Sequence, residues 1–282
     1  MKRPPTGDQA MPKLPFFQID AFASKPFEGN QACVMPLDAF LPDAVLQAIA
    51  AENNVAETAY IVRTGDDSWN LRWFTPAVEV PLCGHATLGS AHALYEELGF
   101  AGEAIHFDTV KSGRLVVRRL DDGRLEMDFP SAAIREIPVT DDVAAALGAR
   151  PVQAWGGMFY AARFETPEEV KALKPDLKAL KSLGVPGEGW DRGNFGCFAA
   201  GGEGVDVTSR FFAPGSGIDE DPATGSWHTM LARVMSERFG KGVLKCYQAF
   251  PGRGAFVDTQ LEGDRVKLIG RAVTVIEGSF TL

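Results

Sequence analysis

Two segments of the chain have the sequence of a buried helix, and each begins directly after a polar loop that contains glycine. The predicted helices span residues 86–98 and 226–239, and apolar side chains cover most of the surface of the first. A helix that is apolar nearly all round is buried in a domain. Because the first N–H groups of a helix have no partner within it, each start can bind an anion. Two such starts, about half the chain apart, predict two similar lobes that close on one ligand.

Three reactive side chains lie beside the predicted elements. Glu57 sits in an apolar stretch, His85 follows Gly84 just before the first helix, and Asp221 shortly precedes Gly225 and the second helix. A carboxylate carries a proton only when its pKa lies near the working pH, which requires burial or a negative neighbour. The apolar frame of Glu57 suits that requirement. His85, beside backbone amides, is suited to orienting a substrate or protonating an oxygen.

Each candidate also has a structural interpretation. Glu57 fits an outward position on a strand edge, His85 a structural histidine, and Asp221 an acidic turn before proline. Gly225 and Ser226 begin a helix, so their N–H groups and the hydroxyl suit a carboxylate. Ser226 also suits plain N-capping, and the two roles are compatible.

Further polar residues are weaker candidates. Asn30 is a candidate for substrate contact, and Arg253 either clamps a carboxylate or closes a turn. His92 lies two helical turns beyond His85 and is interpreted as buried scaffold. No metal is expected, because no carboxylate or third histidine falls at ligand spacing around this histidine pair.

Short strand patterns separated by a few helices predict an α+β fold. Strands are expected at 16–22, 58–62, 71–74, 115–117, 125–129 and 273–276, and helices at 41–53 and from Thr166 until Pro175 interrupts. The simplest architecture that buries both apolar helices is a strand roll around a central helix, built twice. We expect a first lobe over 14–129, completed by C-terminal strands at about 268–282, and a second lobe over 130–267, with the active site in the cleft between them.

Composition excludes several classes of function. The 282 residues have a net charge of −9 and 45% hydrophobic residues, typical of a globular protein that does not bind nucleic acid. Residues 1–13 hold three prolines and no apolar core, so neither a signal peptide nor a membrane segment is expected. Four cysteines without a C-x-x-C pair indicate reduced thiols, and we expect a cytoplasmic protein. No nucleotide-binding glycine motif is present.

Several motifs in order resemble the phenazine-biosynthesis-like (PhzF) family, which shares the two-lobed fold of diaminopimelate epimerase. The matching stretches are 20–22 with 26–30, 56–59, 72–76 with 79–80, 83–87 and 221–226. The resemblance implies a cofactor-independent isomerase that moves a proton on a small carboxylate substrate. It implies Glu57 as the acid/base, with His85, Asp221 and Ser226 lining the cleft, and a homodimer by analogy.

The chain departs from related sequences at three places. Diaminopimelate epimerase exchanges protons with two cysteines, one from each lobe. Cys83 falls near the first position, but no cysteine lies near 221–226, so a single carboxylate is favoured over a thiol pair. Gln31 replaces a common proline, and Trp227 replaces a small residue, which predicts a narrower pocket.

Other functions remain open at this level. One alternative is an amino-acid epimerase or racemase. Another is a hydrolase that uses Ser226, His85 and Asp221, against which the absence of a Gly-x-Ser-x-Gly elbow counts. The third is a non-catalytic binding module, because a family fold does not guarantee activity.

Overall fold

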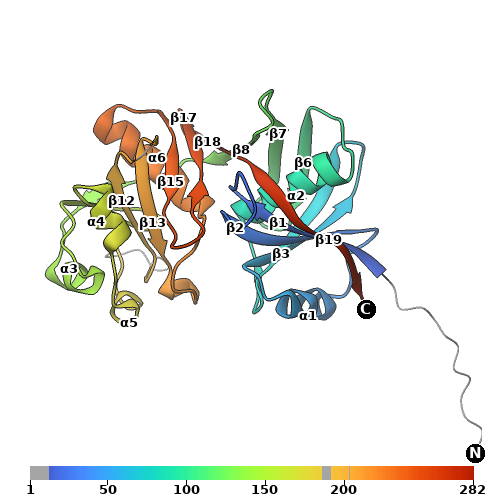
Figure 1. Cartoon of the computed structure of the whole chain (residues 1–282), viewed down its shortest axis with the longest axis horizontal. Coiled ribbons are helices and arrows are strands. Elements are labelled where there is room, and N and C mark those ends of the chain that lie inside the picture. The colour runs from blue at the N-terminus through green and yellow to red at the C-terminus, as the bar shows by residue number, and fades with distance from the viewer. Residues whose placement is uncertain (1–12, 186–191, 203) are drawn as a thin grey trace, which may run out of the picture.

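The larger of two β-sheets has twelve strands and surrounds helix α2 (Gly84–His92) (Figure 1). The computed structural model describes residues 13–185, 192–202 and 204–282. The strand order is β14-β17-β18-β8-β7-β6-β4-β3-β2-β1-β19, and β5 pairs with β4. These strands are β1 (Lys13–Ala21), β2 (Asn30–Leu37), β3 (Glu57–Arg63), β4 (Ser68–Phe74), β5 (Glu79–Val80), β6 (Ala104–Thr109), β7 (Arg114–Arg119), β8 (Leu125–Pro130), β14 (Val243–Leu244), β17 (Asp258–Glu262), β18 (Arg265–Gly270) and β19 (Ala272–Thr281).

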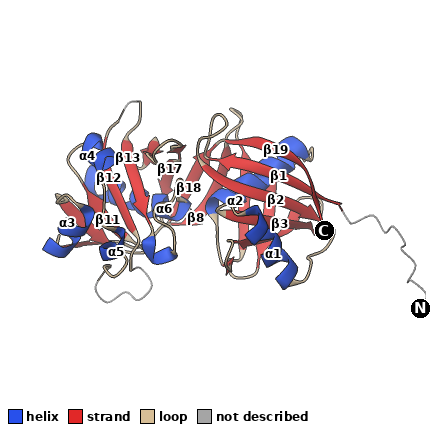
Figure 2. Ribbon diagram, turned by 60° about the horizontal axis from the view of Figure 1, so that its bottom comes forward, coloured by secondary structure: helices blue, strands red, loops and turns tan. Residues whose placement is uncertain are grey.

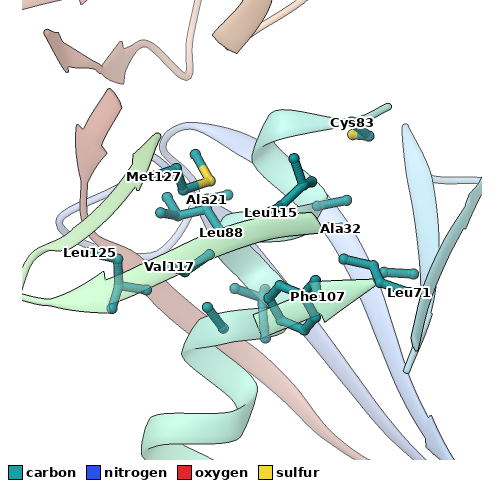
Figure 3. Packing of buried hydrophobic residues seen from close by; sticks show 14 of the residues in the cluster. Ala21, Ala32, Leu71, Cys83, Leu88, Phe107, Leu115, Val117, Leu125 and Met127 are labelled. Atoms are coloured by element: carbon teal, nitrogen blue, oxygen red, sulfur yellow. The ribbon is translucent and has the colours of Figure 1, made fainter. Parts of the chain in front are cut away.

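Helix α2 is buried, as its apolar sequence predicts. It contacts β1, β2, β3, β8 and β19, and Leu88 is completely buried among the strand side chains labelled in Figure 3. A Cβ on Gly89 would lie 3.6 Å from the Cβ of Ala32, so the helix packs closely on the sheet. The helix begins two residues before the expected start, and its last turn is the π-helical segment η1 (Ala93–Glu97). Gly99 follows with φ +68° and ends the helical region where the sequence predicts.

A seven-stranded sheet forms the other half around the second predicted helix, α6 (Gly225–Phe239). Its order is β16-β15-β13-β12-β11-β10-β9. The strands are β9 (Arg135–Ile137), β10 (Gln153–Gly156), β11 (Tyr160–Arg163), β12 (Phe195–Ala200), β13 (Val207–Phe212), β15 (Cys246–Gln248) and β16 (Ala255–Phe256). Phe198 packs on the same side as α6, whereas Cys197 packs with the short helices on the opposite side. Successive side chains of a strand point to opposite faces of the sheet, so each face of this sheet packs in a separate hydrophobic core.

The remaining helices lie outside these central positions. They are α1 (Asp43–Asn53), α3 (Asp141–Leu147), α4 (Pro167–Ala172), α5 (Leu177–Leu180) and the 3-10 turn η2 (Pro214–Ser216). Thr166 caps α4 with a complete capping box, and α5 starts after Pro175, so both sequence predictions are confirmed. Helix α1 starts at Asp43, with Pro42 as its N-cap residue rather than inside its first turn.

The two halves are joined by pairing as well as by the chain. Strand β18 pairs with β8, so β14, β17 and β18 belong to the larger sheet although they follow α6 and β18 contacts that helix. Figure 2 shows α2 and α6 on either side of β8. Strand β19 then pairs with β1 along its length. The limits given for the lobes, 14–129 and 130–267, stay a prediction.

The cysteines and the lengths of the helices bear on two further features of the described chain. All four cysteines are buried and free, so no disulfide links the halves. Across the described residues, every helix is too short or too polar to span a bilayer.

Candidate active site

A cavity of about 440 Å³ lies where the N-terminal ends of α2 and α6 meet. Both halves of the chain line it. The lining residues are Glu57, Pro81, Leu82, Cys83, Gly84, His85, Ser112, Phe129, Pro130, Met158, Phe159, Asp221, Ala223, Thr224, Gly225, Ser226 and Thr229. Six of the predicted site residues therefore line one cavity, although they come from three distant parts of the sequence. They are Glu57, Gly84, His85, Asp221, Gly225 and Ser226. Arginine and lysine are absent from the lining formed by the described residues.

The two helix starts face each other across very little space. Gly84 and Gly225 are the first residues of their helices, and a Cβ on Gly84 would lie 3.6 Å from the Cα of Gly225. Neither helix has a side-chain cap or an acidic residue in its first turn. The unpaired N–H groups of both first turns are thus left for an anion.

Glu57 and His85 form the closest pair of reactive groups. Glu57 begins β3, and its Oε2 atom lies 2.9 Å from Nε2 of His85; the side chains are 17% and 7% exposed. This separation is that of an ion pair, but the ring is not aligned to donate a hydrogen bond. Among the described residues, no donor is directed at the buried Oε2 atom. Glu57 thus lines the cavity while its Oε2 atom lies against the His85 ring.

The surroundings of His85 favour its protonated form. Burial alone would lower the pKa of His85, but the Cys83 sulfur and the Glu57 carboxylate outweigh it and raise this pKa well above the ordinary value. Cys83 Sγ lies 3.5 Å from Nδ1 of His85. Burial, reinforced by Glu57, raises the pKa of the Cys83 thiol. Burial keeps the Cys83 thiol in its neutral form, so the negative charge that faces a protonated His85 is that of the Glu57 carboxylate, 2.9 Å from Nε2.

Asp221 is held between the two halves by neighbouring side chains. Its Oδ1 accepts a hydrogen bond of 2.7 Å from Asn30, and its Oδ2 accepts one of 2.5 Å from Thr224. Gln248 donates to its backbone carbonyl over 2.5 Å. Burial raises the pKa of Asp221 to about 6, although His85 and the two side-chain donors act in the opposite direction. A carboxyl group with this pKa changes charge close to neutral pH.

Asn30 is more central than its sequence suggested. It begins β2, and its Nδ2 atom lies 3.2 Å from Nδ1 of His85 as well as bonding Asp221. The preceding loop contains Phe22 and Phe27 at φ 58° and 73°, a conformation that residues other than glycine seldom adopt. Such strain persists where the surrounding structure fixes it.

Arg253 holds the loop before Asn30 in place and does not contact the cavity. Its Nη2 atom contacts Asp20 Oδ1 at 2.6 Å and the carbonyl of Glu28 at 2.9 Å, and its Nε donates to the carbonyl of Gly29 at 3.0 Å. It does not line the cavity. Of the two roles open for Arg253, the structure supports closure of a turn.

The expected narrowing of the pocket by Trp227 is wrong. Trp227 is completely buried and packs near Phe198 and Phe211, with ring centroids 6.1 and 6.2 Å away. Successive residues of a helix are rotated by about 100°, so Ser226 lines the cavity while the Trp227 ring enters the core. His92 fits its scaffold interpretation, because its Nε2 lies 3.1 Å from the Thr274 hydroxyl.

Sequence reasoning missed several residues of the site. Thr224 and Gln248 position Asp221, and an apolar wall is formed by Phe129, Met158 and Phe159. Thr224 stands within the matching stretch 221–226 but was given no role there, and the other four positions belong to no motif. The fold also brings the Glu57 carboxylate to His85 from a distant strand, a contact that sequence spacing does not indicate.

Comparisons with known proteins agree with this geometry. A family model described as phenazine biosynthesis-like protein matches residues 19–278. A Pseudomonas aeruginosa protein named as an uncharacterized isomerase is 44% identical over 271 residues, 96% of this chain and 99% of that protein. A solved PhzF-family phenazine biosynthesis protein from Enterococcus faecalis has a TM-score of 0.89 at 38% identity, covering 96% of this chain and 100% of that one.

A more distant structure shares only the fold. A hydroxyproline epimerase from Agrobacterium vitis has a TM-score of 0.57 at 10% identity, over 96% of this chain and 93% of that one. The predicted fold class, with two lobes and a central helix in each, is thereby confirmed together with the resemblance to PhzF. The named relatives support an isomerase-type enzyme.

Proposed function

The chain belongs to the phenazine biosynthesis-like family, and from this premise we propose that it is an isomerase that moves a proton between carbon atoms of a small carboxylate substrate without a cofactor. The observation that carries the proposal is the Glu57 carboxylate, which lines the cavity with its Oε2 atom 2.9 Å from Nε2 of His85. A carboxylate in this position can take a proton from carbon and return it. We assign Glu57 as the acid/base.

The substrate carboxylate has a natural position at the paired helix starts. The first-turn N–H groups of α2 and α6 meet at Gly84 and Gly225, and no lysine or arginine in the described lining competes for the anion. Backbone amides at two helix ends supply both hydrogen bonds and positive potential. The Ser226 side chain, in the first turn of α6, adds a hydroxyl at the same place.

His85 and Asp221 supply charge on the two sides of the reacting atoms. A protonated His85 next to Glu57 stabilises negative charge that develops on the substrate when a proton leaves carbon. Asp221, ionised above a pKa of about 6, holds the Asn30 amide and can accept a hydrogen bond from a substrate amine. An epimerase or racemase would also begin by removing a proton from carbon. It would then need a second acid/base group on the opposite face of that carbon atom.

The hydrogen bonds of the site do not favour the hydrolase alternative. His85 contacts Asn30, Cys83 and Glu57, and in the described part of the chain no hydrogen bond joins it to Ser226. A serine nucleophile needs a base within hydrogen-bond reach. A binding module without activity would not need the close pair of Glu57 and His85 at the cavity.

The test is hydrogen exchange from solvent. The protein is incubated in deuterium oxide with a panel of cyclic and unsaturated carboxylic acids, and deuterium at carbon is followed by NMR. We expect exchange with the wild type and a loss of about 10²–10⁴-fold in Glu57→Gln, the range for one general acid/base. Glu52→Gln on the exposed side of α1 is the matched control.

Two results would contradict the proposal. Exchange in Glu57→Gln at the wild-type rate would remove Glu57 from the reaction. Labelling of Ser226 by a fluorophosphonate probe would favour the hydrolase instead. Circular dichroism of both glutamine variants establishes that they are folded.

A further inference from the structure

We propose that Gln248 is a positioning residue for Asp221: its amide fixes the direction of the Thr224 hydroxyl group, so that the hydroxyl hydrogen is directed to the Asp221 carboxylate. Gln248 ends β15 and is completely buried. It does not line the cavity, so its effect on a substrate must pass through Asp221. Only the contact of Asp221 with a substrate rests on the proposed function; the position of the hydroxyl hydrogen is measurable without a substrate.

Two backbone groups fix the orientation of the Gln248 amide. Its Oε1 accepts a hydrogen bond of 3.0 Å from the N–H group of Thr224, and its Nε2 donates to the carbonyl oxygen of Asp221 at 2.5 Å. A backbone N–H can only donate, and a carbonyl oxygen can only accept. Turning the amide over would bring two donors together and two acceptors together, which is costly at a buried position. The amide therefore has one orientation.

The second hydrogen of the same amide nitrogen determines what the Thr224 hydroxyl does. Nε2 of Gln248 lies 3.2 Å from Thr224 Oγ1, so the hydroxyl oxygen accepts on that side. Thr224 Oγ1 also lies 2.5 Å from Oδ2 of Asp221, a separation typical of a hydroxyl that donates to a charged carboxylate. A hydroxyl has one hydrogen to donate. That hydrogen lies on the Asp221 side.

The other polar groups of Thr224 are also bound. Its carbonyl oxygen accepts a hydrogen bond of 2.8 Å from Nδ1 of His228. Burial lowers the pKa of His228 to about 4, so the ring is neutral at pH 7 and carries its one hydrogen on Nδ1. The N–H group of Thr224 is bonded to Gln248. Thr224 is thus held on three sides, and its hydroxyl cannot turn away from Asp221 without breaking one of these bonds.

The Asp221 carboxylate consequently accepts one hydrogen bond on each oxygen. Asn30 donates to Oδ1 over 2.7 Å, and Thr224 donates to Oδ2. Hydrogen bonds to a carboxylate favour its charged form, whereas burial disfavours that form. Burial raises the pKa of Asp221 to about 6, and the bonds from Thr224 and Asn30 oppose this rise. Loss of the donor that Gln248 directs should therefore raise the pKa further.

Charged groups of other elements also face Asp221. His85 of α2 lowers the pKa of Asp221, and Glu57 of β3 raises it. The adjacent Glu220 is bound in a buried ion pair with Arg210 of β13, at 2.7 Å. A neutral substitution in β15 changes none of these charges. A shift in the pKa of Asp221 in such a variant would therefore report on its hydrogen bonds.

The experiment measures the pKa of Asp221 directly, by carbon-13 NMR titration of its carboxyl group in the substrate-free, full-length protein. Gln248→Met keeps the length of the side chain and removes its donor and acceptor. We expect the pKa to rise from about 6 to about 7, a tenfold change in the ionisation constant, because a hydrogen bond to a charged group is lost. Thr224→Val should give the same rise, whereas Thr224→Ser keeps the hydroxyl and should keep the wild-type value.

A double variant separates action through the hydroxyl from general loosening of the loop. In Gln248→Met/Thr224→Val the ionisation constant should again change by about tenfold, because both substitutions remove the same hydrogen bond. The control is Gln260→Met, which removes an amide that bonds the exposed carboxylate of Glu262 and should leave the pKa of Asp221 unchanged. Additive changes, about a hundredfold in the double variant, would overturn the proposal. So would an unchanged pKa in Gln248→Met.

Neutron diffraction tests the wild type without depending on the folding of any variant. Crystals grown in deuterium oxide at pH 7.5 should show the hydroxyl deuterium of Thr224 between Oγ1 and Oδ2 of Asp221. They should also show both amide deuterium atoms on the Gln248 nitrogen, one of them directed at Thr224 Oγ1. A hydroxyl deuterium on any other side of Thr224 Oγ1 would overturn the proposal.

The exchange assay extends the test to the proposed function. If an ionised Asp221 contacts the substrate, the acid limb of kcat/KM should move from about pH 6 to about pH 7 in Gln248→Met. An acid limb that stays in place while the pKa of Asp221 rises would contradict the passage of the effect to the substrate. If the wild type exchanges no substrate hydrogen, the isomerase proposal fails, and the NMR and neutron results still decide whether Gln248 positions Asp221.

Discussion

The side-chain amide of Asn30 donates a hydrogen bond of 2.7 Å to Asp221, although 191 positions separate the two residues. The same nitrogen lies 3.2 Å from Nδ1 of His85 and 3.4 Å from the carbonyl oxygen of Ala223. One side chain of β2 thus joins the start of α2 to the loop before α6. The relative position of the two halves at the cavity depends on this residue.

The stability of Asp221→Asn relative to the wild type is expected to increase from pH 4 to pH 7.5. The pKa of Asp221 is about 6, above the ordinary value of 3.8, because burial disfavours the charged form. The folded state therefore binds more protons than the unfolded state between these values, so the wild type loses stability as pH rises from about 4 to 6. The gain from asparagine should be about 2 kcal/mol larger at pH 7.5 than at pH 4, by urea unfolding.

Asp38→Asn, at an exposed position, is the control for this effect. Its unfolding free energy relative to the wild type should be the same at both pH values. A gain in Asp221→Asn that is equally large at pH 4 and pH 7.5 would show that ionisation of Asp221 is not its source.

Gly84→Ala should weaken substrate binding while leaving the fold intact. The new Cβ would lie 3.6 Å from the Gly225 Cα, an ordinary contact, so no strain is expected. The methyl group nevertheless narrows the gap between the two helix starts, where we place the substrate carboxylate. We expect KM in the exchange assay to rise by about tenfold, the effect of losing about 1.4 kcal/mol of binding, with little change in kcat.

The control is Gly65→Ala, which adds a methyl group in contact only with Ser68. It should change neither constant. An unchanged KM in Gly84→Ala would place the carboxylate elsewhere in the cavity.

The sequence predicts the elements better than it predicts their partners. Periodicity and glycine position locate α2 and α6 to within two residues, because burial of an apolar helix depends on its own side chains. The pairing of β18 with β8 is a contact between distant strands, and no local pattern specifies it. The lobe limits stay a prediction, and they do not specify the pairing of β18 with β8.

The candidate site shows the same division. Glu57, His85 and Asp221 were singled out because each lies beside a predicted helix start or an apolar stretch, and the family motifs then implied their roles. Gln248 was missed, because its role is to bond a backbone carbonyl and a hydroxyl on a loop 24 to 27 positions earlier. Trp227 was misplaced for a related reason: its neighbours line the cavity, but the helical rotation directs its ring into the core.

Gly196→Ala should destabilise the protein through Trp227. A Cβ at residue 196 would overlap the six-membered ring of the tryptophan, which is completely buried. Overpacking of this kind costs about 1–3 kcal/mol. Because phenylalanine lacks the overlapping part of the ring system, the same substitution in a Trp227→Phe background should cost less, as measured by urea unfolding of the four proteins in the cycle.

Additive costs in this cycle would contradict direct packing between the two residues, since residues in contact show a coupling energy. Substrate exchange provides a second readout. Trp227→Phe should keep its KM, because the tryptophan does not line the cavity. A changed KM would restore the narrowing of the pocket that the sequence predicts.

Arg253→Ala should lower the free energy of unfolding by about 3 kcal/mol, because it leaves the buried carboxylate of Asp20 without its cation. Asp20 is 1% exposed, and among the described residues it keeps only the hydrogen bond from the Phe27 N–H group. The substitution also releases the carbonyls of Glu28 and Gly29, which precede Asn30. Activity should therefore fall more than the folded fraction does.

Arg265→Ala removes the ion pair between Arg265 and Asp128, whose side chains are 45% and 30% exposed. Pairs of this kind contribute about 0–1 kcal/mol, so the two alanine variants should differ clearly in urea unfolding. In the double variant Asp20→Asn/Arg253→Ala the cost should be smaller, because the unpaired buried charge is gone. Equal costs for the Arg253 and Arg265 variants would mean that the Asp20 pair is not what fixes the loop before Asn30.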